Sequence, residues 1–479
     1  MSNAEYKTTI GLEVHAELKT RTKMFCDSKN DADEERPNVN ICPICMGHPG
    51  TLPAINKEAV KHVIKVGMAV GGKIADFTEF DRKNYFYPDI PKGYQISQYK
   101  YPLVSGGSLN GVELTRVHLE EDTATSKHDR GDFSLVDFNR AGVPLMELVT
   151  EPVIHSAKEA SDFARELQLL LQYLGAGDAN MEKGEMRVEA NISVSKTDEF
   201  GTKVEVKNLN SFRAVERAIA YEVDRMIAML EKGEKVVQET RGWDENGQKT
   251  FSQRAKENSH DYRYFPDPDL PKLKIAEMPE FSADALKTEM PELPWQKRDR
   301  YKKEFGLKDE DVEMYVRFET WGIYFEAVAK ILKDLKLITI ASNYLTSDLA
   351  GLVKKDPDNW GGDLFTLAEK MPPENFAELV TMFNENKISS RGAKDILALM
   401  YTGETASSLA VEKELLQKNN ADELKPMIEE IVALHPTVVA DYKAGKQSAL
   451  QFFVGQAMKA SKGSANPGMV QQILKEILN

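Results

Sequence analysis

Two short segments carry acidic and imidazole side chains at a spacing that suits a metal ion. IGLEVHAE at residues 10–17 and HLEED at residues 118–122 are flanked by apolar residues and are typical of β-strands. Successive side chains of a strand point to opposite faces, so Glu13, His15 and Glu17 share one face. Burying such a row is costly unless a charged partner, such as a divalent cation, meets it. The alternative is a solvated sheet face with outward carboxylates.

Further carboxylates lie on predicted strands of the same region. Glu147 interrupts an apolar run, and Glu189 and Glu205 lie on two strands that follow a helix predicted at residues 156–174. The combined set is one histidine and five carboxylates: His15, Glu13, Glu121, Glu147, Glu189 and Glu205. Oxygen-rich sites with one imidazole suit Mg²⁺ or Mn²⁺ better than a closed zinc site. Because these ions bridge nucleotide phosphates in phosphoryl transfer, the residues predict a metal-dependent, nucleotide-using site.

A segment at residues 81–98 interleaves aromatic residues, cations and prolines without a helical or strand period. We expect a loop here, in which Arg82 and Lys83 could meet phosphates and Tyr85 could stack on a base. The alternative is a rigid packed loop. The sequence has no P-loop, dinucleotide fingerprint, zinc-protease motif or nucleophile elbow, which removes the usual nucleotide-binding and hydrolase patterns.

The cysteines are three in number and are not scattered. Cys42 and Cys45 form a CxxC pair, and Cys26 lies upstream. A tight CxxC turn suits tetrahedral zinc, but three thiolates leave one ligand to be supplied by Asp27, His48 or water. The alternative is a group of buried thiols near a turn. Disulfides are not expected in a chain with the features of a cytosolic protein.

Length and composition place these residues in a multidomain protein. A chain of 479 residues is too long for one core, so we expect a β-rich domain at residues 1–292, a helical domain at 293–405 and a helical tail at 406–479. Two prolines within residues 290–294 mark the first boundary. The sequence has neither a membrane-length apolar run nor a signal pattern, so we expect a cytoplasmic protein.

The charge of the chain is uneven. The net charge of −14 argues weakly against nucleic acid, but residues 441–479 carry five lysines against two acidic residues. This end could contact RNA, although a solvated helix face would look the same on charge alone.

Nine segments, in this order, resemble the B-subunit family of the aspartyl/glutamyl-tRNA amidotransferases from about residue 9 to the C-terminus. They are IGLEVHAELKT, CPICMGHPGTLPAIN, DRKNYFYPDIPKGYQISQ, HLEEDTATSKHD, DFNRAGVPLMELVTEP, EANISV, VEVKNLNSF, DYRYFPDPDLP and FFVGQAMKASKGSANP. The resemblance implies an α+β multidomain fold. Its parts would be a β-rich, cradle-like catalytic domain, an all-α domain, and a small α-helical tail bundle similar to YqeY-type proteins, which binds tRNA.

The resemblance also implies an activity and partners. A ligase of this family uses ATP and Mg²⁺ to phosphorylate the side-chain carboxylate of Glu-tRNA(Gln) or Asp-tRNA(Asn). Ammonia from an amidase-signature A subunit then displaces the phosphate, and a small C subunit completes a heterotrimer. Carried over by motif, His15, Glu121 and Glu147 would hold the catalytic Mg²⁺, Glu13, Glu189 and Glu205 a second cation, and Lys83 the phosphates.

One departure bears on zinc. Zinc-bearing members of the family have a second cysteine two residues after the first, where this chain has Ser28, so a zinc at Cys26, Cys42 and Cys45 would lack a ligand. Two other functions remain open: a non-catalytic tRNA-binding subunit, and a free-standing ATP-dependent ligase. A non-catalytic subunit needs no metal-bridging carboxylates, so the acidic residues argue against it. The second needs its own source of ammonia, and no glutaminase nucleophile motif occurs.

Overall fold

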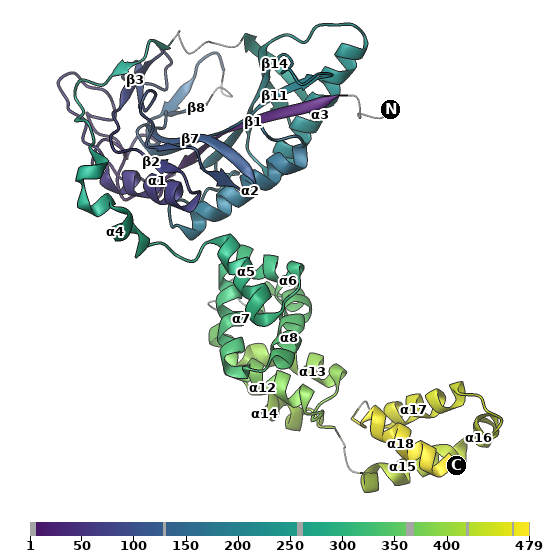
Figure 1. The fold of residues 1–479 in the computed structure, drawn as a ribbon. Helices are drawn as coiled ribbons and strands as arrows, with labels where there is room; N and C mark the ends of the chain where they lie inside the picture. Colours follow the sequence, from purple (N-terminus) through teal and green to yellow (C-terminus); the bar gives the residue numbers. More distant parts are fainter. Residues whose placement is uncertain are drawn as a thin grey trace. The chain divides into compact units, whose positions relative to one another are not determined.

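The computed structural model describes residues 6–127, 131–255, 262–360, 368–417, 421–461 and 464–478. The chain divides into two compact units, Met1–Pro294 and Trp295–Asn479 (Figure 1). The division follows the proline-containing segment that the sequence marked. The family motifs at residues 118–129, 261–271 and 452–467 include positions 128, 129, 261, 462 and 463, which lie outside the described residues.

The first unit is built on a large mixed sheet. Its ten described strands follow the order β14-β13-β12-β11-β1-β10-β7-β5-β2, with β6 paired to β7. The β12–β13 pair is parallel and the neighbouring pairs are antiparallel. The strands are β1 (Lys7–Glu17), β2 (Lys73–Ile74), β5 (Val104–Ser105), β6 (Ser108–Leu109), β7 (Val112–Glu121), β10 (Pro144–Thr150), β11 (Met186–Ser195), β12 (Val204–Leu209), β13 (Glu239–Asp244) and β14 (Lys249–Ala255).

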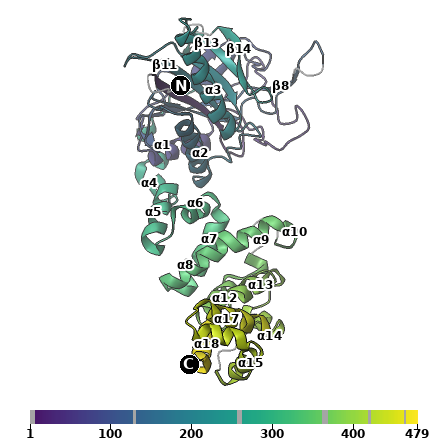
Figure 2. The ribbon, with the colours of Figure 1, turned by 90° about the vertical axis from the view of Figure 1, so that its right-hand side faces the viewer.

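Three amphipathic helices pack on the apolar face of this sheet. They are α1 (Lys57–Ala69), α2 (Ala157–Tyr173) and α3 (Phe212–Glu231). Figure 1 shows α1 and α2 beneath the sheet, and Figure 2 shows α3 beside β13 and β14. The side chains of Asn56, Ser156 and Ser211 accept hydrogen bonds from the first turns, which fixes where each helix begins. The helix predicted at residues 156–174 is thereby confirmed.

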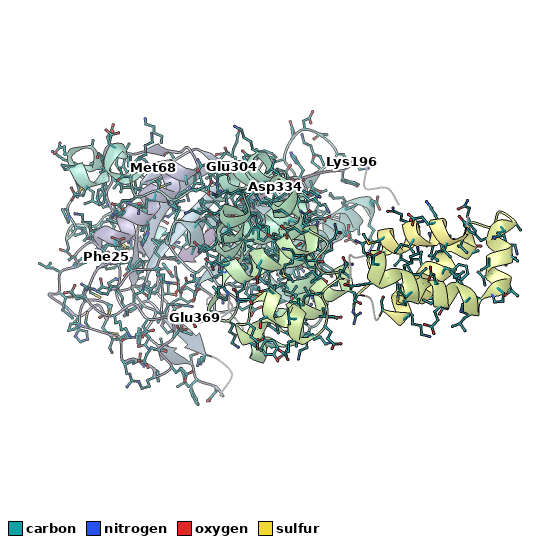
Figure 3. The ribbon with its side chains drawn as sticks, turned by 90° about the horizontal axis from the view of Figure 1, so that it is seen from below. Phe25, Met68, Lys196, Glu304, Asp334 and Glu369 are labelled. Atoms are coloured by element: carbon teal, nitrogen blue, oxygen red, sulfur yellow. The ribbon has the colours of Figure 1, made fainter. Side chains whose placement is uncertain are left out.

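The opposite face of the sheet is polar and lies under a small three-stranded sheet. Its order is β15-β3-β4, formed by Phe265–Pro266, Asp81–Asn84 and Tyr94–Ser97. The prediction of an irregular loop at residues 81–98 is confirmed for residues 85–93 and was wrong for the two flanking strands, because four-residue strands are too short to show a period. Phe25, labelled in Figure 3, packs edge to face against Phe80, with 5.3 Å between the ring centroids. A separate hairpin pairs β8 (Thr125–Lys127) with β9 (Leu135–Asp137).

The second unit is helical throughout its described part. Asp334, labelled in Figure 3, caps α8 by accepting hydrogen bonds from the backbone nitrogens of Lys336 and Leu337. The last four helices share a core in which Phe453 is fully buried and Ala457 nearly so. The helices are α5 (Pro294–Phe305), α6 (Asp309–Arg317), α7 (Glu319–Leu332), α8 (Leu335–Asn343), α9 (Ala350–Lys355), α10 (Pro357–Trp360), α12 (Pro373–Asn384), α13 (Ser390–Leu397), α14 (Ala406–Glu412), α15 (Ala421–Leu434), α16 (Pro436–Lys443), α17 (Ser448–Ala460) and α18 (Pro467–Leu478).

The arrangement of an α+β domain followed by helices is the predicted fold class. α14, which begins at Ala406, packs against α12 and α13. The tail boundary at 405/406 stays a prediction. Within the described residues, no helix is long and apolar enough to cross a membrane.

Candidate active site

The register of the central strands brings a histidine, a carboxylate and a second histidine into one row. His15 on β1 pairs with Glu147 on β10, and Glu147 pairs with His118 on β7. Leu12, Val14 and Ala16 of β1 are buried on the apolar face, so the alternate residues Glu13 and His15 project from the polar face. Strand alternation thus builds the row from three segments that are far apart in the sequence.

Glu13 and Glu120 complete a cluster around this row. The His15 Nε2 atom lies 3.5 Å from Glu147 Oε2, 3.6 Å from Glu120 Oε1 and 3.8 Å from Glu13 Oε1. The His118 Nε2 atom lies 3.5 Å from Glu147 Oε2. Three acidic groups therefore surround His15. We call these five residues, Glu13, His15, His118, Glu120 and Glu147, the carboxylate–histidine cluster.

Burial and crowding shift the pKa values in this cluster. Burial and the charges of Glu147 and Glu189 raise the pKa of Glu13 to about 7, and burial and Glu147 also raise that of Glu120. Although burial opposes it, the acidic neighbours, Glu147 first, raise the pKa of His15 to about 9. Glu147 is likewise buried, yet His118 and His15 hold its pKa well below the usual range. The cluster thus has an excess of acidic groups that a cation would stabilise.

The ligand atoms of this cluster fit a small divalent cation. One ligand atom from each of Glu13, His15 and Glu147 lies within 4.8 Å of the others, and His118, Glu120 and Glu147 form a second such group. Opposite ligands of Mg²⁺ lie about 4.2 Å apart, because each metal–oxygen distance is about 2.1 Å. Arg116 Nε donates to His118 Nδ1 across 3.4 Å, which leaves the proton of neutral His118 on Nε2, facing Glu147. We therefore expect His15 as the imidazole ligand, while His118 orients Glu147.

Lys83 of β3 extends toward the acidic cluster. Burial opposes the charge on its amine, but Glu120 and Glu147 hold its pKa well above the usual value. Its Nζ atom lies 4.9 Å from the ring centre of Tyr262 and 5.9 Å from that of Tyr85. Within the described residues, Lys83 donates no hydrogen bond and has no carboxylate within 4.0 Å. A protonated amine is thus available beside the cluster.

Glu121 does not join this cluster, and its predicted place beside His15 and Glu147 was wrong. It projects from the other face of β7, where its carboxylate lies 2.5 Å from Lys92 Nζ and accepts a hydrogen bond from the Ile96 nitrogen. The residue that faces His15 is Glu120. The physical reason is strand alternation, because Glu120 lies two positions after His118 and shares its face.

The predicted second cation site is arranged around a lysine. The Lys207 Nζ atom lies 2.8 Å from Glu189 Oε2 and 3.8 Å from Glu205 Oε2, and Glu205 also accepts a hydrogen bond from Thr240. Glu13 pairs with Glu189 across the strands. Among the described residues, Glu13, Glu189 and Glu205 do not form a group with metal-ligand spacing. The structure therefore does not bring them together as ligands, because the Lys207 ammonium already pairs with two of them.

Arg82 lies apart from Lys83. Its Nε donates to Asp267 across 2.7 Å, its Nη2 donates to Asp269 across 2.9 Å, and its guanidinium stacks over the Tyr94 ring. These contacts fasten β3 to the segment after β15, so the structure does not place Arg82 with the predicted phosphate contacts. Tyr85 lies on the Lys83 side, with its ring centre 5.9 Å from that of Tyr262.

Comparison with known proteins identifies the family. Residues 8–279 match the family model described as the GatB/GatE catalytic domain, and residues 323–478 match that of the GatB domain. The chain belongs to the GatB family. Relatives named as the B subunit of an aspartyl/glutamyl-tRNA(Asn/Gln) amidotransferase include those of Persephonella marina (43% identical over 486 residues, 99% of this chain and all of the relative) and Thermodesulfovibrio yellowstonii (42% over 485 residues, 99% of each chain). A relative from Brevibacillus brevis with the same name is 42% identical over 488 residues, again 99% of each chain.

This GatB chain also brings its three cysteines together. The Sγ atoms of Cys26, Cys42 and Cys45 lie within 4.8 Å of one another, with Cys42 and Cys45 3.9 Å apart. This spacing fits three thiolate ligands of zinc, whose sulfurs lie about 3.8 Å apart in a tetrahedron. Outside the three cysteines, the side-chain groups within hydrogen-bonding distance of Cys45 Sγ are Ser28 Oγ and Lys23 Nζ, each at 3.8 Å, instead of Asp27 or His48. Zinc therefore stays a prediction with three protein ligands.

Three residues of the polar face were not predicted from the sequence: His118, Glu120 and Lys207. Alternation along β7 would have found Glu120 from His118, and alternation along β12 would have found Lys207 from Glu205. The sequence therefore contained the signals for all three.

Proposed function

We propose that this chain is the ATP-using subunit of a tRNA-dependent amidotransferase. In this proposal it phosphorylates the side-chain carboxylate of Glu-tRNA(Gln), Asp-tRNA(Asn) or both, and then completes the amidation with ammonia. The observation that carries the proposal is the buried carboxylate–histidine cluster beside the lysine Lys83. The relatives are named as the B subunit of an aspartyl/glutamyl-tRNA(Asn/Gln) amidotransferase. This name is the reason for proposing a tRNA-bound substrate and an amide product.

In the proposed mechanism, Glu13, His15 and Glu147 would hold Mg²⁺, and the Glu120 carboxylate, 3.6 Å from His15 Nε2, would add negative charge beside the ion. The bound ion would screen the negative charge of the ATP phosphates and of the substrate carboxylate. Lys83 binds the phosphate oxygens, and its charge stabilises the negative charge that develops during phosphoryl transfer. His118 orients Glu147 through the 3.5 Å contact. The rings of Tyr85 and Tyr262 lie beside the Lys83 amine.

The chemistry balances in two steps. A carboxylate oxygen of the substrate attacks the γ-phosphorus of ATP, and ADP leaves. The resulting acyl phosphate is a good acyl donor, so ammonia attacks its carbon, the carbon–oxygen bond to the phosphate breaks, and the proton that ammonia loses leaves with inorganic phosphate. A carboxylate alone does not react this way, because its oxygen is a poor leaving group.

Partners follow from this reaction. We expect an A subunit that releases ammonia from glutamine, a small C subunit, and the misacylated tRNA, with the tail helices α15–α18 as the RNA contact. Of the tail lysines that give it positive charge, Lys462 lies outside the described residues. We expect a cytoplasmic location, because aminoacyl-tRNA is a substrate of translation.

The test is ATP-dependent phosphate release by the chain co-purified with its A and C subunits. We expect strong stimulation by Glu-tRNA(Gln) or Asp-tRNA(Asn) over the uncharged tRNA, and loss of this stimulation in Glu147→Gln with tRNA binding retained. Phosphate release that does not respond to the aminoacyl group would refute the proposal. Equal loss of tRNA binding and phosphate release in the variant would favour a scaffold role.

A further inference from the structure

The CxxC pair lies in a turn that holds two sulfurs side by side at different depths. The Met46 nitrogen donates to the Cys42 oxygen across 3.0 Å, which closes the turn that contains both cysteines. Cys45 is buried, with 4% of its surface exposed, whereas Cys42 is half-buried. Their Sγ atoms lie 3.9 Å apart, so one sulfur can reach the other by a small rotation and a shift of the turn.

Two nitrogen atoms contact the sulfur of the buried Cys45. Lys23, itself fully buried, places its Nζ atom 3.8 Å from Cys45 Sγ, and the Cys42 nitrogen donates to the same sulfur across 3.1 Å. These contacts hold the Cys45 sulfur in place beside the Cys42 sulfur. Cys26 is the third thiol of the group, and Ser28 offers a hydroxyl in place of a fourth.

We propose that Cys42 and Cys45 form a thiol–disulfide exchange site that reacts with small-molecule disulfides of the glutathione class. The half-buried Cys42 attacks one sulfur of the small disulfide, forms a mixed disulfide and releases one small thiol. Cys45 then attacks the Cys42 sulfur, forms the Cys42–Cys45 disulfide and releases the second small thiol. Two protein thiols are oxidised and one small disulfide is reduced to two thiols, so atoms, protons and electrons balance. This inference does not depend on the proposed function.

Oxidation of Cys42 and Cys45 would change the shape of a neighbouring cavity. The two sulfurs must approach from 3.9 Å to a bonded distance of about 2.05 Å. The loop that carries them packs directly on Lys92, because a side-chain carbon added at Gly47 would lie 2.7 Å from Lys92 Cγ. Lys92 in turn pairs with Glu121. Cys26, Cys45, Gly47, Lys92 and Glu121 all line one cavity of about 210 Å³, so the disulfide changes a wall of that cavity.

The test exposes the full-length chain to glutathione disulfide, quenches it with acid and counts free thiols by mass spectrometry after alkylation. We expect the free thiols to fall from three to one, with full recovery after dithiothreitol, and peptide mapping to place the bond between Cys42 and Cys45. Cys45→Ser should accumulate a stable glutathione adduct on Cys42, whereas Cys42→Ser should form neither disulfide nor adduct. Cys26→Ser is the matched control and should still form the disulfide.

The outcome does not depend on the variants folding, because the wild-type chain gives the thiol count, the bond position and the reversibility. A bond that includes Cys26, or three thiols that stay unreactive in the native chain yet react after denaturation, would overturn the proposal. One tightly held zinc per chain, measured by metal analysis, together with unreactive thiols would also overturn it.

Discussion

Replacing Glu120 by glutamine tests which of two neighbouring carboxylates serves the carboxylate–histidine cluster. Glu120 Oε1 lies 3.6 Å from His15 Nε2, and only 2% of the surface of the residue is exposed. A unit charge 4 Å from another contributes about 4 kcal/mol at an effective dielectric constant of about 20. Part of this attraction offsets the cost of burying the carboxylate, so we expect Glu120→Gln to weaken Mn²⁺ binding by at least about 2 kcal/mol, roughly 30-fold.

The same variant should behave in the opposite way without metal. Burial and the charge of Glu147 raise the pKa of Glu120, so the buried carboxylate destabilises the metal-free fold. A neutral amide of the same shape removes that repulsion, and we expect the free energy of unfolding to rise by about 1 kcal/mol, or the melting temperature by roughly 2–4 °C. Glu120→Gln is thus expected to be more stable alone and less stabilised by Mg²⁺.

The assay is a titration with Mn²⁺, followed by electron paramagnetic resonance of the free ion, with thermal melts in the presence and absence of Mg²⁺. Glu121→Gln is the matched control, because Glu121 lies on the other face of β7 and binds Lys92. We expect its Mn²⁺ affinity to stay within about threefold of the wild type, a difference below about 1 kcal/mol. If Glu121→Gln loses the ion and Glu120→Gln keeps it, the reasoning from strand alternation is refuted.

Three further predictions test the surroundings of the site. Lys83→Met should lower tRNA-stimulated phosphate release by roughly 100-fold, with Mn²⁺ binding intact, because it removes the charge beside the phosphates; a normal rate would contradict the role given to Lys83. Lys207→Met leaves Glu189 and Glu205 without their cation, so urea unfolding should show a loss of about 2–3 kcal/mol, partly restored by Mg²⁺; unchanged stability would show that the ion pairs contribute little. His62 is buried and its pKa is lowered, so the folded state binds fewer protons than the unfolded state, and stability should fall as the pH drops below about 6.5. In His62→Gln, urea midpoints measured above and below that pH should lose part of this dependence; an identical dependence would assign it to other groups.

The sequence predicted the strands that carry the site because their apolar residues either alternate over many positions or form a short continuous run. The long strands β1 and β11 show this period, and β1 places Glu13 and His15 on the predicted face. β10 is instead a continuous apolar run, and Glu147 reaches the same face through its pairing with His15. Assigning Glu121 to that face neglected the same rule, which selects Glu120 once His118 is counted. The error concerned one position on a correctly predicted strand.

Other features depended on tertiary contacts that no local pattern encodes. The strands β3 and β4 have four residues each, so the alternation could not be recognised, and the hairpin is stabilised by its pairing and by Arg82 bridging to Asp267. The closeness of Cys26 to the CxxC turn likewise follows from packing between segments that are separate in the sequence. Lys207 shows a different limit of sequence-based prediction. Carboxylates such as Glu189 and Glu205 can be paired by a lysine or by a metal ion, and their spacing in the sequence is the same in both cases.

The most direct test of the central claim follows the oxygen atoms of the substrate. Glu-tRNA(Gln) or Asp-tRNA(Asn) is prepared with the heavy isotope of oxygen in the side-chain carboxylate and is incubated with ATP, glutamine and the complete complex. If this chain phosphorylates that carboxylate, each amide formed transfers one labelled oxygen to inorganic phosphate, as mass spectrometry of the phosphate will show. Amide formation with unlabelled phosphate would mean that ATP is cleaved elsewhere, and the role proposed for the carboxylate–histidine cluster would be contradicted.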